Sequence, residues 1–147
     1  MTEVRRADAT WQGDLLSGSG VVSASTSGAF SDLPVSWASR TEASNGKTSP
    51  EELVAAAHAS CFSMAFSSNL AKAGFPAERL DVSADVTFDK LEGGWTVTRS
   101  ALTVRGVVPG ISPEAFQTAA EAARDGCPIS RALKGNVELS VDATLEG

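Results

Sequence analysis

Two segments of the chain, residues 80–88 and 137–145, alternate apolar with mostly polar residues. A period of two places the apolar side chains of a strand on one face, so each segment is predicted to be a strand with one buried face. The Gly93-Gly94 step predicts a hairpin turn after the first of them, with a return strand over residues 95–107. The apolar positions of that return strand change phase, which predicts a β-bulge near Ser100.

The N-terminal part of the chain, residues 8–38, is rich in Gly, Ser and Thr and alternates only over short stretches. This pattern predicts short antiparallel strands joined by turns, around Trp11, Val21-Val22 and Leu33 to Trp37. The next segment, residues 39–49, is polar and contains an Asn-Gly step, which is typical of a loop.

A long helix is predicted to begin directly after this loop. Ser49 is a suitable N-cap, Pro50 suits the first helical position, and Glu52 completes a capping box. Gly74 marks the end of the helix. Between them, residues 53–72 are small or apolar around almost the whole circumference, which is typical of a buried helix.

Two further helices are predicted before the last strand. Ser112-Pro113-Glu114 opens a helix that closes at Gly126, and Pro128 opens a short one with Cys127 at its start. The predicted order is βββ-α-ββ-α-α-β, which is an α+β fold, and 147 residues are expected to form a single domain over residues 1–147.

Composition excludes several classes of function. With 12 basic against 18 acidic residues and a pI of about 4.7, the chain lacks the basic surface that nucleic acids or anionic membranes require. No signal peptide or membrane-length apolar run is present, so we expect a soluble cytoplasmic protein with no nucleic acid and no membrane partner. The single histidine and the two cysteines do not have the spacing of metal ligands, so we expect no metal site. The sequence has no glycine-rich phosphate-binding loop, so we expect no nucleotide cofactor either.

The two cysteines are the candidate chemical groups. Cys127 is predicted at a helix N-terminus, where unpaired N–H groups lower the pKa of a thiol. Cys61 lies on the small-residue helix, where a cysteine is often only packing. A buried thiol together with a second, more accessible one suits oxidation to a sulfenic acid and resolution as a disulfide.

His58 lies three residues before Cys61, on the same helix face. In one interpretation His58 acts as a base for the Cys61 thiol. In the other, His58 is a buried, hydrogen-bonded residue of a helix interface, and we favour this second interpretation.

Glu51 and Arg40 are the candidate charged groups. Glu51 has no capping role, but ten residues separate it from Cys61, about 15 Å along a straight helix. Either the helix breaks, or Glu51 of a partner chain approaches the cysteine. An arginine such as Arg40, held by a carboxylate, would favour a nearby thiolate.

Several motifs resemble the OsmC/Ohr family of thiol-dependent peroxidases. They are SPEELVAAAHASCFSMA at 49–65, VPGIS at 108–112, GCPISRAL at 126–133, and the flanking WQGD at 11–14 and DVTFDK at 85–90. With histidine at position 58 the sequence resembles the OsmC branch of the family, because the Ohr branch typically has tyrosine at this position. The resemblance implies an intertwined homodimer with antiparallel sheets wrapped around buried central helices, and two active sites at the dimer interface.

The resemblance also implies a mechanism and its residues. Cys61 corresponds to the peroxidatic cysteine, Cys127 to the resolving cysteine, and Arg40 and Glu51 to the catalytic arginine and glutamate. We expect Cys61 to reduce organic hydroperoxides, and hydrogen peroxide less well, and a lipoyl-type or thioredoxin-type dithiol to reduce the resulting Cys61–Cys127 disulfide, without metal, flavin or haem. The alternatives are a cysteine hydrolase or acyltransferase using Cys61 with His58, and a non-catalytic dimer that binds an apolar ligand.

Overall fold

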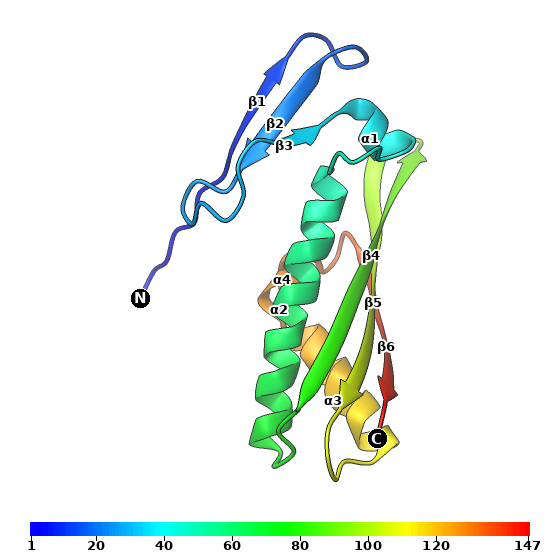
Figure 1. Cartoon of the computed structure of the whole chain (residues 1–147). Helices are drawn as coiled ribbons and strands as arrows, with labels where there is room; N and C mark the ends of the chain where they lie inside the picture. The colour runs from blue at the N-terminus through cyan, green and yellow to red at the C-terminus, as the bar shows by residue number, and fades with distance from the viewer. The chain divides into compact units, whose positions relative to one another are not determined.

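The computed structural model describes residues 1–147, which divide into two compact units, residues 1–53 and 54–147 (Figure 1). The expectation of a single domain stays a prediction. The first unit contains β1 (Asp8–Gln12), β2 (Ser19–Ser23), β3 (Leu33–Val35), α1 (Trp37–Thr41) and the start of α2 (Pro50–Lys72). The second unit contains the rest of α2, β4 (Arg79–Leu91), β5 (Gly94–Val107), α3 (Pro113–Gly126), α4 (Pro128–Leu133) and β6 (Glu138–Leu145).

The three short strands predicted in the first unit form one antiparallel sheet in the order β1-β2-β3. Gly20 of β2 is opposite Trp11 of β1. A Cβ atom at Gly20 would lie 2.6 Å from the indole ring of Trp11, so only glycine lets the ring lie against the neighbouring strand.

The sequence predicts a strand that ends at Trp37 and a loop over residues 39–49. This prediction is wrong for residues 37–41, because Trp37–Thr41 form the short helix α1. Ser36 caps the helix, and the Ser36 and Ser39 side chains form a reciprocal capping box. Ser39 Oγ also donates to the carbonyl of Thr48, at 2.8 Å, which fixes the remainder of the predicted loop.

The predicted ends of α2 are confirmed. Ser49 Oγ accepts the Glu52 backbone N–H at 3.1 Å, while the Glu52 carboxylate accepts the hydroxyl of Thr48 instead of closing the predicted box. At the other end, Gly74 has a φ of +92°, and the N–H of Phe75 donates to the Leu70 carbonyl.

The second unit contains a mixed sheet in the order β4-β5-β6. β4 and β5 are antiparallel as predicted, but β6 is parallel to β5, which corrects the expectation of antiparallel sheets. The reason is the connection, because α3 and α4 carry the chain back before β6 begins. The predicted bulge is confirmed two residues from Ser100, where Thr98 is the extra residue in β5.

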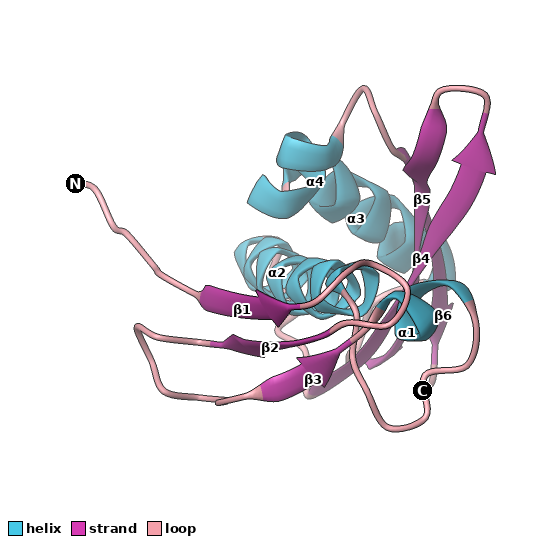
Figure 2. Cartoon of the chain, turned by 90° about the horizontal axis from the view of Figure 1, so that it is seen from above, coloured by secondary structure: helices cyan, strands magenta, loops and turns pink.

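The core of the second unit lies between this sheet and two helices, α2 and α3, which cover the same face of the sheet (Figure 2). The ring of Phe66 in α2 lies 5.0 Å from that of Phe116 in α3. A Cβ atom at Gly106 of β5 would lie 2.6 Å from the Phe116 ring, so the absence of a side chain there makes room for the aromatic contact.

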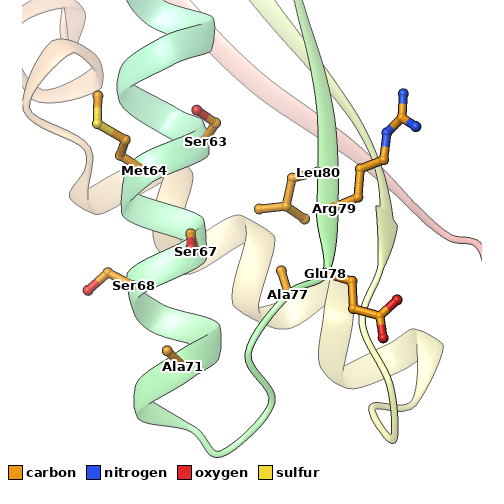
Figure 3. A pocket seen from close by; sticks show the side chains of 9 residues that line it. All are labelled: Ser63, Met64, Ser67, Ser68, Ala71, Ala77, Glu78, Arg79 and Leu80. Carbon is orange, nitrogen blue, oxygen red and sulfur yellow. The ribbon is translucent and has the colours of Figure 1, made fainter.

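The other face of α2 is open in the single chain, although the sequence predicts a helix buried all round. Met64 on this face has a relative exposure of 69%, whereas Phe62 and Phe66 on the core face have none. A groove of about 510 Å³ runs between this face and the start of β4. Ala77 and Leu80 point toward α2, and the Glu78 and Arg79 side chains point away (Figure 3). No helix of the chain has both the length and the apolar character needed to cross a membrane.

Candidate active site

Arg40 and Glu51, two of the predicted site residues, form an ion pair within the first unit. Arg40 Nε lies 3.1 Å from Glu51 Oε1, and Arg40 Nη2 lies 2.8 Å from Oε2, so the guanidinium and the carboxylate meet through two parallel hydrogen bonds. Glu51 is buried, with 8% exposure, while the side chain of Arg40 keeps 29%. A fork of this kind holds the arginine in one orientation and leaves part of a cation accessible.

A pocket of about 280 Å³ adjoins Arg40 in the same unit. Its walls are mostly apolar and come from Trp11, Leu15, Val35, Ser36, Trp37 and Pro50. The Arg40 guanidinium also lies over the Trp37 ring, 5.5 Å from the ring centre. An apolar pocket with one oriented cation suits a ligand that has a hydrocarbon part and a polar or anionic end.

The two cysteines are brought together in the second unit, although 66 positions separate them in the sequence. Cys61 lies on α2, and Cys127 is both the C-cap of α3 and the N-cap of α4. Each thiol affects the pKa of the other, so the two side chains lie near each other. Both are free thiols in the structure, and their proximity suits the formation of a disulfide.

The expected order of accessibility is wrong. Cys127 has no exposure and belongs to the hydrophobic core, whereas Cys61 is partly exposed. The reason is the short turn between α3 and α4, which directs Cys127 inward. The more accessible thiol is therefore the predicted nucleophile rather than its resolving partner.

The pKa of Cys127 is lowered, as its predicted position at a helix start implies. Burial alone would raise this pKa, but the hydrogen bond from Cys61 and those from the backbone N–H and hydroxyl of Ser130 outweigh it. The Cys127 side chain forms no capping hydrogen bond in α4.

The pKa of Cys61 is raised, first by burial and then by the interaction with Cys127. A thiol that donates to a neighbouring thiolate is harder to deprotonate, which raises its pKa. The backbone N–H of Ile129 and the charge of Arg131 act in the opposite direction and do not compensate. The groups of the second unit therefore do not lower the pKa of Cys61 below that of Cys127.

His58 is the buried, hydrogen-bonded histidine that we favoured. It has no exposure, and burial lowers its pKa. Nδ1 lies 2.6 Å from Ser100 Oγ and Nε2 lies 2.8 Å from Ser130 Oγ. Because both ring nitrogens are engaged by hydroxyl groups, neither is available as a base for Cys61, which weakens the hydrolase alternative.

Sequence reasoning missed Ser100 and Ser130, which form hydrogen bonds with His58 and have no exposure of their own. Neither belongs to a motif whose chemistry is evident from spacing. The available signal was a serine three residues after a cysteine at a predicted helix start. No group of three His, Cys, Asp or Glu side chains in the chain is arranged to hold a metal ion.

The sequence and the α+β fold are similar to those of a known class of proteins. A family model described as "OsmC-like protein" matches residues 43–142, a range that includes Glu51, Cys61 and Cys127 but not Arg40. The chain is 42% identical over 139 residues to Peroxiredoxin OsmC of Escherichia coli, covering 95% of this chain and 96% of that protein. The chain therefore belongs to the OsmC/Ohr family.

Relatives of the Ohr type are more distant. The organic hydroperoxide resistance protein of Xanthomonas axonopodis pv. citri is 31% identical over 96 residues, covering 64% of this chain and 65% of that protein. The crystal structure of the organic hydroperoxide resistance protein OhrB of Bacillus subtilis superposes with a TM-score of 0.74 at 25% identity, covering 95% and 98% of the two chains. The α+β fold predicted from the order of helices and strands is confirmed.

Proposed function

We propose that this protein is a cysteine-based peroxidase that reduces organic hydroperoxides, and hydrogen peroxide less efficiently. The observation that carries the proposal is the pair of neighbouring thiols, with Cys61 partly exposed and packed against the core that contains the buried Cys127. The relatives named peroxiredoxin and organic hydroperoxide resistance protein support the same type of activity.

The proposed reaction has three steps. The Cys61 thiolate attacks one peroxide oxygen, the O–O bond breaks, and an alcohol leaves after taking up a proton, so that Cys61 becomes a sulfenic acid. Cys127 then attacks the Cys61 sulfur and a disulfide forms as water is released. A dithiol of the lipoyl or thioredoxin type reduces the disulfide and returns both thiols.

Arg40 is the proposed source of the positive charge that ionises Cys61, and Glu51 orients it. The surroundings of Cys61 raise its pKa, burial first, so an additional cation is needed to ionise it. The bidentate pair with Glu51 supplies an arginine with a fixed fork. During attack, the same guanidinium would stabilise the alkoxide that develops on the leaving oxygen.

We further propose that the working form is a homodimer in which Arg40 and Glu51 serve Cys61 of the partner chain. Helix α2 is continuous from Pro50 to Lys72, which removes the alternative of a broken helix. The open face of α2, with Met64 exposed and small residues around it, is the kind of surface that a second copy would cover.

The apolar pocket at Arg40 favours alkyl or aryl hydroperoxides over hydrogen peroxide, because a hydrocarbon group loses contact with water when it enters. The proposed role is defence of the cytoplasm against oxidative or osmotic stress.

The lowered pKa of Cys127 favours a reactive thiol over one that only packs. The raised pKa of Cys61 is consistent with the proposed activity only if another group, here Arg40, ionises this thiol.

The test is to mix the reduced protein with one equivalent of cumene hydroperoxide and to measure peroxide consumption and protein mass. We expect one cumyl alcohol for each Cys61–Cys127 disulfide. Cys61→Ser should consume no peroxide, while Cys127→Ser should consume it and accumulate sulfenic and then sulfinic acid at Cys61. Full thiol-dependent turnover by Cys61→Ser would contradict the mechanism, and acylation of Cys61 by an activated ester without peroxide consumption would favour a hydrolase.

A further inference from the structure

A buried set of polar side chains, which we call the serine–histidine relay, adjoins the cysteine pair. It consists of Ser100 of β5, His58 of α2 and Ser130 of α4, joined in that order by hydrogen bonds of 2.6 and 2.8 Å. None of the three has any exposure, and no buried side-chain nitrogen or oxygen atom of the chain lacks a hydrogen-bond partner. A fully satisfied polar network of this kind holds its members in one arrangement.

The relay reaches the sulfur of Cys127 through Ser130. Ser130 follows Cys127 by three residues in the first turn of α4, a spacing that brings side chains to the same side of a helix. The Ser130 hydroxyl is among the groups that lower the pKa of Cys127, so it acts on the thiolate form. A single hydroxyl group therefore connects His58 Nε2 with this sulfur.

The tautomer of His58 decides whether Ser130 has a hydrogen to donate. Burial keeps the ring neutral, with one N–H and one acceptor nitrogen. When Nε2 carries the hydrogen, the ring donates to Ser130 Oγ, and the serine hydrogen is left for the Cys127 sulfur. When Nδ1 carries it, Ser130 has to donate to Nε2, and no serine hydrogen remains for the thiolate.

We propose that His58 is a positioning residue for the disulfide-forming step, and that its Nε2–H tautomer aims the Ser130 hydroxyl at the Cys127 sulfur. In this step the Cys127 thiolate attacks the sulfenic sulfur of Cys61. The S–S bond forms, the S–O bond breaks, and hydroxide leaves and takes a proton from solvent. The relay contributes no electrons and no net proton, because it acts by keeping Cys127 ionised.

The inference rests on the proposed function for the role of Cys127, but its physical core is the ionisation of one thiol. The titratable group that faces Cys127 directly is Cys61 of α2, while His58 acts through Ser130 and Arg131 of α4 acts on Cys61. Replacing Cys61 by serine removes the second titrating thiol and leaves the relay unchanged.

A pH titration of thiolate absorbance in the Cys61→Ser background measures this ionisation directly. The chain has no tyrosine, so Cys127 is the group whose ionisation raises the ultraviolet absorbance. Ser130→Ala and His58→Leu should each raise the pKa of Cys127 by about one unit, which is about tenfold less thiolate at a pH below both values. Ser130→Thr and His58→Gln keep a hydroxyl and an N–H donor and should restore most of the effect.

Ser83→Ala is the matched control, because Ser83 is an exposed serine of β4 in the same unit. It should leave the titration unchanged. Ser130→Ala removes a single oxygen atom and keeps the experiment decisive if His58→Leu does not fold. An unchanged pKa of Cys127 in folded Ser130→Ala would overturn the proposal.

Nitrogen NMR of the ring provides a second readout, since His58 is the only histidine. The Nε2–H tautomer should be the main form above the pKa of Cys127, and this dependence should disappear in Ser130→Ala. An Nδ1–H ring in the presence of the Cys127 thiolate would contradict the proposed geometry.

Rapid-quench kinetics with cumene hydroperoxide connect the relay to the reaction. Ser130→Ala should form the disulfide about tenfold more slowly near neutral pH, in proportion to its thiolate, with Cys61 oxidised at the wild-type rate. Equal slowing of both steps, or of neither, would contradict a role in the second step. If wild-type protein does not react with the peroxide at all, the proposed function fails, while the titration still decides whether the relay ionises Cys127.

Discussion

The Arg40–Glu51 pair and the serine–histidine relay are two polar clusters of opposite construction. The pair consists of full charges, and 29% of the Arg40 side chain is exposed. The relay consists of neutral groups with no exposure at all. A charged, partly hydrated group suits the stabilisation of an anion that develops on an incoming substrate, whereas a neutral network can tune a buried thiol without leaving a charge unpaired in the core.

The same contrast applies to the two cysteines. The donors around Cys127 lie in its own unit and lower its pKa against the effect of burial. Cys61 is partly exposed, and burial followed by its hydrogen bond to Cys127 raises its pKa. In the proposed mechanism each cysteine is therefore ionised by a different cluster, Cys61 by the pair and Cys127 by the relay.

Removal of the charged cluster should have the largest effect. Arg40→Met is expected to lower kcat/KM for cumene hydroperoxide by about a hundredfold, since it removes a donor at the developing oxyanion. Arg40→Lys keeps the charge but loses the fork to Glu51, and should recover only part of the activity. Steady-state kinetics with a dithiol reductant measure both values.

Arg99→Met is the matched control for Arg40→Met. Arg99 also pairs with a glutamate, Glu138, but at the surface, with 57% and 68% of the two side chains exposed. Its loss should change kcat/KM by less than about twofold, because exposed ion pairs contribute little. An equal loss of activity in the two variants would show that the Arg40 effect is not local.

The pocket beside Arg40 should determine substrate preference. Trp37→Ala is expected to lower kcat/KM for cumene hydroperoxide relative to hydrogen peroxide by about tenfold, since it removes apolar wall area that only the organic substrate contacts. The ratio of the two kcat/KM values in each variant is the measurement. A parallel loss for both peroxides would indicate that Trp37 acts only by holding Arg40, over which its ring lies.

The smallest expected effect concerns the neutral cluster and stability. The imidazole of the unfolded chain is protonated below a pKa of about 6.5, whereas burial lowers the pKa of His58 in the folded chain. The unfolded state therefore binds more protons in this range. The contribution of His58 to the free energy of unfolding is therefore fully present above pH 6.5 and should fall, as the pH drops toward the folded pKa, by at most about 1.4 kcal/mol per pH unit.

The free energy of unfolding of His58→Gln should lack the pH dependence that comes from the histidine. It should keep the pH dependence that comes from the carboxylates, which the variant does not change. Urea unfolding of both proteins between pH 5 and pH 7 measures the two slopes, and the difference between them isolates the histidine. Identical slopes would mean that folding does not shift the pKa of His58, which would contradict the effect of its burial.

Local signals in the sequence predicted most elements of the fold. The alternation over residues 80–88 and 137–145, the cap at Ser49 and the stop at Gly74 each act through neighbouring residues, and each is confirmed. The parallel pairing of β6 with β5 was not predictable in the same way, because strand direction depends on where α3 and α4 return the chain. Helix α1 was missed because five residues carry little periodicity.

The candidate site was predictable to the extent that its motifs are contiguous. The structure brings Cys61 near Cys127 and joins Arg40 to Glu51, while the roles of these residues stay predictions. The relative accessibility of the two cysteines was not predictable, because it depends on how the α3–α4 turn packs into the core. Ser100 was not predictable either, since it meets His58 only after β5 and α2 have packed together.

A single-turnover comparison of Arg40→Met with Ser130→Ala tests most directly whether the two clusters divide the reaction between them. Reduced protein is mixed with excess cumene hydroperoxide and quenched with acid, and Cys61 sulfenic acid and the Cys61–Cys127 disulfide are counted by mass spectrometry over time. We predict that Arg40→Met slows the appearance of oxidised Cys61 and leaves its conversion to disulfide unchanged, and that Ser130→Ala does the reverse. Slowing of the same step by both variants would contradict the account.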